Sequence, residues 1–531
     1  MSNITEHPLG EEEAFEGEIF KQDKTKIDPE LEAIHDFKGK YPKQLWSLFL
    51  SEMWERFCFY GMRGMLVVFM ITNLPGLDGV SKMPERDANL QYGSIQAFVY
   101  AFTFIGGLFA DKILGFRKSL FWGGLLMITG SIILAIDPKA FFFLGISFTV
   151  VGTGFFKPNI STMVGQLYRD GDVRRDAGFS LFYSGINIGA LLGGYACITI
   201  GQSNHPWSWN LAFGLAAIVM TISLVTFIFT KRHLGPIGLS PFKDAADGKK
   251  AKAKWFELIV FIGSLAVIPL IMTMVKRPEY TDYFMYTIGP LTLLYLFYEM
   301  SKHNMVEKKK LIAALIFIVF SILFWAFFEQ AGGSLSIFAN SNLDDKILGF
   351  LKVNPVGVNN SANSLFVIIF APLVGILWLA MAKRKIEPNT VVKFGLGFVF
   401  LGLAYFIFFS TRFFANAQGI ANLNVFTSAY LIVTLGELCL SPIGLSIMTK
   451  LSPVRLQGVM MGMWFLASAY GQYVAGLIGA GMADASSGGS LPEKLITYTE
   501  SFKQLGIYAI IAGGVLIIIS PMVRKLMGDV K

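Results

Sequence analysis

The chain has 531 residues, of which 53% are hydrophobic and only 15% are charged, and its mean hydropathy is +0.54. A soluble domain carries about 25% charged residues, so this composition excludes a soluble globular protein and indicates an integral membrane protein. The net charge of +8 does not indicate nucleic-acid binding, because the basic residues lie in short loops between apolar runs. The three cysteines, Cys58, Cys197 and Cys439, lie in apolar runs and have neither disulfide nor metal-site spacing.

Residues 1–43 precede the first apolar run and are polar and acid-rich. They contain no apolar stretch of the kind that a signal peptide needs, so we expect no cleavable signal. We expect this segment to be a cytoplasmic tail that is mostly disordered.

Apolar runs long enough to cross a bilayer recur through the rest of the chain. We expect fourteen of them, at 44–72, 89–110, 118–136, 140–163, 178–200, 210–230, 255–275, 282–300, 310–337, 362–382, 390–410, 424–448, 457–481 and 503–523. Basic residues cluster in every second connection, which by the positive-inside rule places these connections and both termini in the cytoplasm.

A long, basic connection at 233–254 divides the spans. It predicts an N-terminal six-helix bundle (44–232), a linker with two extra transmembrane helices (233–307) and a C-terminal six-helix bundle (308–531). This all-α layout is typical of transporters that work by alternating access. The extra pair carries almost no charge within the membrane, so we expect it to be a structural hairpin outside the transport pathway.

The first span contains a cluster of charges, in the sequence SEMWERFCFYGMRG (51–64). One charged side chain at mid-membrane costs roughly 2.5–3.5 kcal/mol. Positions 52, 56, 60 and 63 share one face of a helix, so this face must look onto protein or water. The sequence therefore predicts a polar cavity around Glu52, Glu55, Arg56 and Arg63.

Two further spans carry polar residues at unusual places. Lys157 stands directly before Pro158 in the fourth span, and we expect it to pair with Glu52 or Glu55; the alternative is that it reaches back to the cytoplasmic interface. In the fifth span Asn187 lies among glycines spaced for close helix packing, and it serves either as a hydrogen-bond donor between helices or as a ligand contact.

Three sequence blocks together resemble the proton-dependent oligopeptide transporter family. They are Glu52-x-x-Glu55-Arg56-Phe57-x-x-Tyr60-Gly61, Phe-Phe-Lys157-Pro-Asn and Phe-Tyr-Ser-Gly-Ile-Asn187-x-Gly. The loop from Gly107 to Lys118 is similar to a signature of the major facilitator superfamily, to which that family belongs. The resemblance covers about residues 44–526, and the two extra helices look like the bacterial branch.

The resemblance implies a major facilitator fold and a symporter that imports di- and tripeptides with protons across the cytoplasmic membrane. It implies a secondary transporter rather than an enzyme, with protons as the coupling ion and no cofactor. The implied partners are peptides, protons and membrane lipid, with no obligate protein partner and no nucleic acid.

The resemblance also assigns roles to individual positions. Arg63 and Lys157 match residues that receive the peptide carboxylate, and Tyr60 and Tyr100 match tyrosines that bind the peptide backbone. The remaining matches are Asn187, Glu329, Asn363 and Glu437 around the peptide amino terminus, and Trp464 and Ser468 in the pocket lining. Arg63 and Glu329 lie equally far along two spans of the same direction, so we expect them to meet as an external gate.

Proton coupling has to use carboxylates, because all five histidines lie in the tail, in loops or at helix ends. The candidate proton-coupling residues are Glu52, Glu55, Arg56, Lys157 and Glu329.

Two alternatives remain open at this point. The same fold can carry nitrate or an amino-acid derivative, or the protein is a membrane sensor that does not transport. An enzyme is disfavoured, because the sequence has no phosphate-binding loop, no nucleophile elbow and no cluster of metal ligands.

Overall fold

The computed structural model describes residues 28–76, 79, 81–169, 171–243, 247–440, 444–453, 456–528 and 530. This part of the chain is almost entirely helical. Residues 1–27 of the expected tail lie outside it, so the expectation of disorder there stays a prediction.

The helices of the N-terminal half are α2 (Pro29–His35), α3 (Lys43–Asn73), α4 (Glu85–Phe109) with the π-turn η1 (Ala110–Leu114), α5 (Phe116–Ile136), α6 (Phe142–Gln166), α7 (Arg175–Gly201), α8 (Ser208–Thr230) and η2 (Lys231–His233). The middle of the chain forms α9 (Asp247–Ala266), α10 (Ile268–Lys276) and α11 (Pro278–Ser301).

The C-terminal half contains α12 (Met305–Phe328), η3 (Glu329–Gly332), α13 (Ser334–Asn342), α14 (Pro355–Lys383), α15 (Thr390–Ser410), η4 (Thr411–Phe414), α16 (Leu423–Leu440), α17 (Gly444–Leu451), α18 (Gln457–Ala485) and α19 (Leu491–Met527). Two short strands, β1 (Lys346–Ile347) and β2 (Leu351–Lys352), form an antiparallel pair in which Lys346 lies opposite Lys352.

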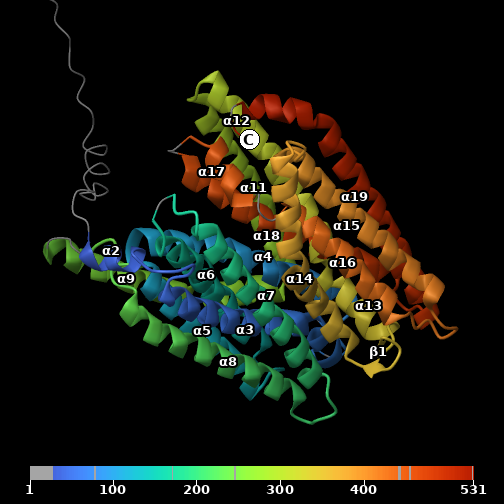
Figure 1. The fold of residues 1–531 in the computed structure, drawn as a ribbon. Coiled ribbons are helices and arrows are strands. Elements are labelled where there is room, and N and C mark those ends of the chain that lie inside the picture. Colours follow the sequence, from blue (N-terminus) through green and yellow to red (C-terminus); the bar gives the residue numbers. More distant parts are fainter. Residues whose placement is uncertain are drawn as a thin grey trace, which may run out of the picture.

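The two halves form two helical bundles that lie side by side, with α3–α8 at lower left and α12–α19 at upper right in Figure 1. Within the bundles α3 packs on α7 and α15 packs on α19. Between the bundles α4 packs on α18 and α7 packs on α14. Glycine makes the first of these contacts possible, because a Cβ added at Gly93 would lie 2.8 Å from the Cα of Gly476. The bundles therefore meet along two pairs of helices and leave the space between them for a site.

Within the described residues, ten helical segments, some of them made of consecutive helices, are long and apolar enough to cross a membrane. The remaining long helices α3, α6, α11 and α18 fall short by composition. In α3 the four charged residues of the cluster at 52–63 lower the hydropathy, and in α6 Lys157 and Asn159 lower it. In α11 tyrosines contribute, and Tyr283, Tyr286, Tyr295 and Tyr298 are exposed near its two ends, where interfacial aromatic residues of a spanning helix lie.

Three expected spans are interrupted. The run 310–337 ends as a regular helix at Phe328, passes through η3 and resumes after Gly333, whose φ of −107° and ψ of −107° are not helical. The run 255–275 breaks at Val267, directly before the start of α10. The run 424–448 divides into α16 and α17, with residues 441–443 outside the described part. Glu329 therefore lies at a helix break and not in a regular helix.

The expectation of a disordered tail is wrong for residues 28–42. Asp28 caps α2, and its side chain accepts a hydrogen bond from the backbone of Glu30 at 3.0 Å. The ring nitrogen Nε2 of His35 lies 3.1 Å from the carbonyl oxygen of Gln166, and the guanidinium of Arg174 lies 3.9 Å from the centroid of Phe37. Cation–π and polar contacts thus hold this segment against the end of α6 and the loop that follows it.

The helices α9–α11 contact both bundles. On the N-terminal side Trp122 donates a hydrogen bond to Ser264 at 2.9 Å, and Lys118 pairs with Glu257 at 2.6 Å. On the C-terminal side the Tyr473 hydroxyl donates to Asp282 at 2.6 Å. These helices therefore pack on both bundles, and their place outside the transport pathway stays a prediction.

Candidate functional site

One end of the molecule, which we call the gate end, is where α3 ends and α4 begins. Polar contacts between the two bundles concentrate there. Lys494 pairs with Glu85 at 2.7 Å, and Arg86 pairs with Asp484 at 3.1 Å. Ser361 of α14 donates to the carbonyl of Leu191 at 3.0 Å. These contacts join the bundles at the gate end.

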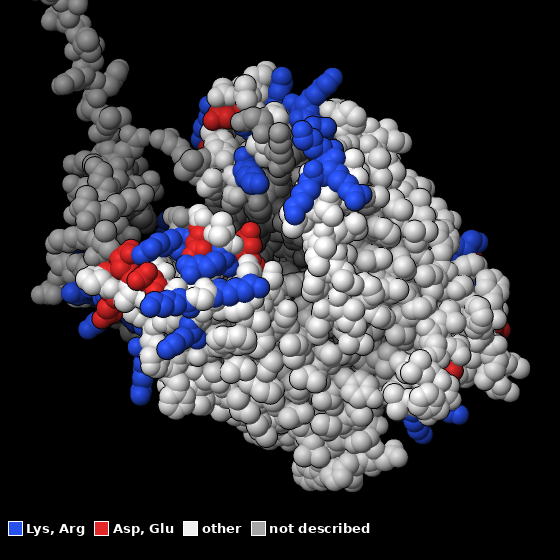
Figure 2. Space-filling model, in the orientation of Figure 1, with Lys and Arg blue, Asp and Glu red and all other residues white. Residues whose placement is uncertain are grey.

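At the opposite end, which carries the basic loops, the space-filling view shows a hollow between the bundles (Figure 2). Lys and Arg side chains border this hollow on both sides. Several polar side chains from the middle of the helices are partly exposed. They are Tyr60, Arg63, Tyr100, Lys157, Asn363 and Glu437. The structure is closed at the gate end and hollowed at the other.

Glu52, Glu55 and Arg56 of α3 form a buried cluster of charges. The Nε atom of Arg56 is 3.0 Å from Glu52 and 2.5 Å from Glu55, and the three side chains are at most 4% exposed. Gly189 of α7 packs on the backbone of α3 at this point, so that α7 covers the cluster. Both oxygens of Glu55 lack a hydrogen bond within the described part of the chain. Two carboxylates thus share one buried guanidinium.

Lys157 does not form the ion pair that its position predicts. Within the described residues its ammonium pairs with no carboxylate; it lies 4.3 Å from the ring centroid of Tyr100 and 5.9 Å from that of Phe59. Arg56 already occupies the two carboxylates, and an aromatic face is the favourable neighbour that remains for the cation. The alternative, in which Lys157 reaches the interface, is not observed either, because these rings belong to α3 and α4 inside the bundle.

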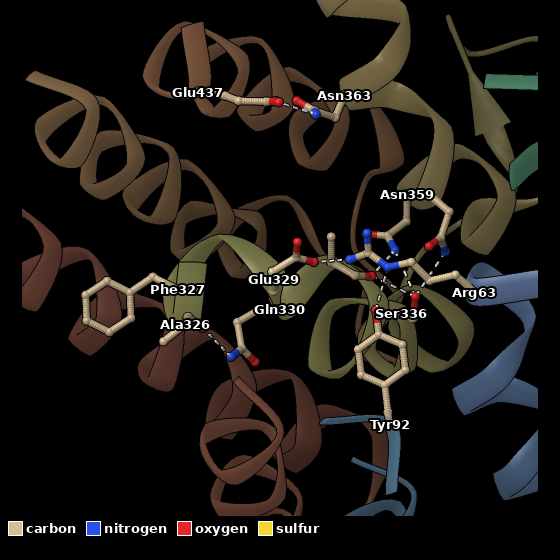
Figure 3. A network of polar contacts seen from close by, with 12 residues as sticks. Arg63, Tyr92, Ala326, Phe327, Glu329, Gln330, Ser336, Asn359, Asn363 and Glu437 are labelled. Atoms are coloured by element: carbon tan, nitrogen blue, oxygen red, sulfur yellow. Dashed lines mark hydrogen bonds and ion pairs between the residues drawn. The ribbon is translucent and has the colours of Figure 1, made fainter. Parts of the chain in front are cut away.

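Arg63 and Glu329 meet across the two bundles. One terminal nitrogen of Arg63 donates to Glu329, and the Nε atom donates to the hydroxyl of Tyr92 at 2.8 Å. The Arg63 side chain is 12% exposed and that of Glu329 is 3% exposed. Gln330, the residue after Glu329, donates at 3.0 Å to the carbonyl of Ala475 in α18 and so holds the helix break against α18. Figure 3 shows this group around Arg63.

Glu437 forms a second polar centre, apart from the Arg63 group in Figure 3. Asn363 donates to Glu437 at 2.8 Å and accepts a hydrogen bond from Thr434 at 2.7 Å. The hydroxyl of Tyr183 lies 3.4 Å from the other carboxylate oxygen. Because Thr434 fixes the orientation of the amide, the NH₂ group of Asn363 points at Glu437. A carboxylate that stays partly exposed among such donors can accept a positively charged group from the hollow.

Three predicted pocket residues have no hydrogen bond to another helix of the described structure. Two of them, Asn187 and Ser468, form a hydrogen bond within their own helix. Asn187 donates to the carbonyl of Tyr183 at 3.0 Å, and Ser468 donates to that of Trp464 at 3.3 Å. The Trp464 ring packs on Gly444, and its side chain is buried. Their place in the binding pocket stays a prediction.

Sequence reasoning missed Tyr92, Tyr183, Trp325 and Thr434. Tyr92 had a usable signal, because positions 92, 96 and 100 share one helical face with the predicted Tyr100. Trp325 lies one turn before Glu329, and its indole N–H has no partner in the described structure. No pattern in the sequence indicates Tyr183 or Thr434, because their contacts with Glu437 and Asn363 depend on how α7, α14 and α16 pack together.

The architecture and the site define a class of protein. Two helical bundles that meet through opposite charges at one end and leave a hollow at the other, with partly exposed charged side chains in long apolar helices, are typical of a membrane transporter. The family model of the POT family matches residues 117–493, and the chain belongs to this family.

Known relatives and structures agree with this assignment. "Peptide transporter YePEPT" from Yersinia enterocolitica is 35% identical over 92% of this chain and 96% of its own length. "Di-/tripeptide transporter" from Lactococcus lactis is 32% identical over 92% of this chain and 97% of its own length. The solved structure of peptide transporter POT in complex with sulfate matches with a TM-score of 0.77 and 33% identity, covering 94% of this chain and 100% of that one. The helical arrangement fits the major facilitator type.

Proposed function

We propose that this protein is a symporter that imports di- and tripeptides together with protons by alternating access. A short peptide at neutral pH carries one negative and one positive end. The observation that carries the proposal is a pair of opposite, partly exposed poles, with Arg63 and Lys157 on the N-terminal bundle and Glu437 with Asn363 on the C-terminal bundle. The names of the relatives, which are peptide and di-/tripeptide transporters, support the same cargo.

In this proposal the peptide bridges the bundles. Its carboxylate lies at Arg63 and Lys157, and its amino terminus lies at Glu437. Among the described residues the ammonium of Lys157 has aromatic rings but no carboxylate as neighbours within ion-pair distance, which supports this assignment, because a ligand carboxylate would supply the missing counter-charge. Tyr60, Tyr100, Asn187, Glu329, Asn363, Trp464 and Ser468 complete the predicted binding site.

The proton sites in this proposal are Glu52 and Glu55 around Arg56, and Lys157 and Glu329 are the further coupling residues of the predicted set. When all three side chains of the cluster are ionised, two carboxylates and one guanidinium leave one net negative charge in a buried place. Binding of one proton neutralises the cluster, which is the simplest way to bury it. The coupling ion is the proton, and no cofactor takes part.

We further propose fourteen membrane-spanning helices in the order six, two, six, with both termini in the cytoplasm of a cell with an inner membrane. The basic connections support this orientation. The gate end is then external, and the structure represents an inward-facing state. No obligate protein partner is part of this proposal.

A second cargo class, the amino-acid derivatives, is favoured by one observation. A POT family transporter solved in complex with 5-aminolevulinic acid matches this chain with a TM-score of 0.75 and 28% identity, over 93% of this chain and 99% of that one. That compound also carries an amine and a carboxylate, so it fits the same two poles. Competition of 5-aminolevulinic acid with dipeptide uptake tests this cargo.

The peptide assignment is tested with Glu437→Gln and two substrates, a free dipeptide and its N-acetylated form. A hydrogen bond to a charged group contributes about 1.5–3 kcal/mol, so we expect the variant to lose about tenfold or more in apparent affinity for the free dipeptide. The preference for the free over the acetylated peptide should shrink by the same factor. Glu299→Gln, in the hairpin, is the matched control. Unchanged uptake and unchanged preference in Glu437→Gln would exclude Glu437 as the amino-terminal site.

A further inference from the structure

Tyr92 of α4 lies between the charge pair of the gate and the break in the helix that carries Glu329. Its hydroxyl accepts a hydrogen bond from Nε of Arg63 at 2.8 Å, and the side chain is 1% exposed. The same hydroxyl occupies the place where a side chain would stand at Gly332, so that a Cβ added there would collide with it. Figure 3 shows Tyr92 directed at Arg63 from below.

The two contacts of Tyr92 belong to different bundles. Arg63 on α3 and Tyr92 on α4 are parts of the N-terminal bundle, whereas Gly332 at the end of η3 is part of the C-terminal one. A second residue of α4 supports the same docking point, because the side chain of Asn89 lies against Gly333, 2.8 Å from where a Cβ would stand. The helix break therefore seats on the face of α4 that holds Arg63.

We propose that Tyr92 is a positioning residue of the gate: its hydroxyl fixes the guanidinium of Arg63 in the orientation that Glu329 meets when the bundles close. This inference deepens the proposed function and rests on it, since gate closure has a role only in a protein that alternates between two states. When the bundles separate at the gate end, the Arg63–Glu329 pair breaks, but the Arg63–Tyr92 bond lies within one bundle and can persist.

The hydroxyl matters because a guanidinium has a fixed fork of donors. With the Tyr92 hydroxyl as the acceptor of Nε, the guanidinium of Arg63 is oriented before Glu329 arrives to accept from a terminal nitrogen. Without the hydroxyl, the long side chain has to be ordered again at each closure, which costs conformational freedom. Glycine at 332 is part of the same arrangement, because any side chain there would displace the hydroxyl.

The test measures the gate itself and not transport. Spin labels are placed at Trp207→Cys and Phe413→Cys, two exposed positions at the gate end, one on each bundle. The three native cysteines are buried, which keeps labelling selective. Distance distributions in lipid nanodiscs then give the ratio of gate-closed to gate-open protein.

We expect Tyr92→Phe to raise the gate-open fraction relative to the gate-closed fraction by about tenfold, the lower end of the effect of a hydrogen bond to a charged group. Tyr405→Phe is the matched control, because it also removes a buried tyrosine hydroxyl, which donates to the backbone of Phe327 within the C-terminal bundle at 2.6 Å. Tyr405→Phe should leave the ratio unchanged.

The double variant with Glu329→Gln separates positioning from packing. If Tyr92 acts through the Arg63–Glu329 pair, Tyr92→Phe adds no further shift once Glu329 is neutral, whereas independent packing effects add. Gly332→Ala, which keeps the tyrosine but displaces its hydroxyl, should produce the same shift and serves if Tyr92→Phe does not fold.

An unchanged ratio in Tyr92→Phe, or a full additional shift in the double variant, would overturn the proposal. Failure of the proposed function is distinguishable from this result. A protein that carries no peptide would still give the Tyr92-dependent distance change, and a peptide transporter without this role for Tyr92 would transport but show no such change.

Discussion

At the scale of single residues, the site is governed by the cost of burying charge. Arg56 is 2% exposed and compensates two carboxylates, whereas Lys157 compensates none in the described structure. A buried charge that loses its only partner is strongly destabilising. We therefore expect each carboxylate of the cluster to bind a proton or another cation when it separates from Arg56. This is the physical reason for assigning proton coupling to the cluster and substrate binding to the free lysine.

The first prediction at this scale concerns Glu55, the cluster carboxylate with 0% exposure. Glu55→Gln keeps the shape of the side chain but cannot bind or release a proton. We expect gradient-driven accumulation of dipeptide to fall to the level reached without a gradient, while exchange of labelled for unlabelled peptide across the membrane continues. Both are measured in the same proteoliposomes.

Glu257→Gln is the control for this experiment, because Glu257 pairs with the exposed Lys118 outside the site. Accumulation by Glu55→Gln that equals the unmodified protein would remove Glu55 from the coupling machinery. Loss of both accumulation and exchange would point to a defect in binding or folding instead.

Sequence reasoning reached many residues of the site because charge is rare in a membrane span and each charged residue needs an explanation. Arg63, Glu329, Asn363 and Glu437 lie at polar centres in the structure. The pairing of Lys157 was wrong, because helix-face arguments give the neighbours of a residue but not the competition between Arg56 and Lys157 for the same carboxylates. Tyr92 was missed although it shares a helical face with Tyr100, because a tyrosine in an apolar run costs little free energy and does not stand out as a charged residue does.

At the scale of elements, two features of the helices could not be predicted from hydropathy. The break at Glu329–Gly333 coincides with the polar and glycine-rich sequence EQAGG, but apolar residues continue on both sides, and the geometry of the break depends on the contacts of η3 with α4 and α18. The helix α2 is short, and its stability comes from contacts with the end of α6 rather than from its own propensity. Both elements are stabilised by tertiary contacts.

We predict that the hairpin α9–α11 contributes to the stability of the protein and not to its affinity for peptide. Tyr473→Phe removes the hydrogen bond between α18 and Asp282 of α11 and changes no residue of the binding site. We expect the free energy of unfolding to fall by about 1 kcal/mol, with a melting temperature lower by about 1 °C, and the apparent affinity for dipeptide to stay the same.

Thermal unfolding in detergent and dipeptide uptake together check this expectation. Ser264→Ala, which removes the partner of Trp122 on the other bundle, is the comparison within the same hairpin. A changed affinity with unchanged stability would show that the hairpin takes part in transport and would contradict its structural role.

At the scale of the whole molecule, the bundle arrangement follows from the order of the apolar runs and from the basic connection at 233–254. The composition of the chain reveals the membrane class, and the grouping of runs indicates two bundles with a pair between them. What the sequence could not supply is the state of the molecule, because closure at the gate end depends on contacts between residues as distant in sequence as Glu85 and Lys494. In a transport cycle the same chain forms and breaks these contacts, so the pattern of the sequence does not indicate whether the gate end is open or closed.

Proton-coupled peptide import is tested by uptake of an unmodified dipeptide into sealed proteoliposomes, with and without an inward proton gradient and an inside-negative potential. Each positive charge that moves inward gains about 2.3 kcal/mol per 100 mV, so a symporter concentrates the peptide when both driving forces are present. We predict concentrative uptake that collapses when a protonophore is added. Binding of dipeptide without gradient-driven uptake, in vesicles shown to be sealed, would contradict the account.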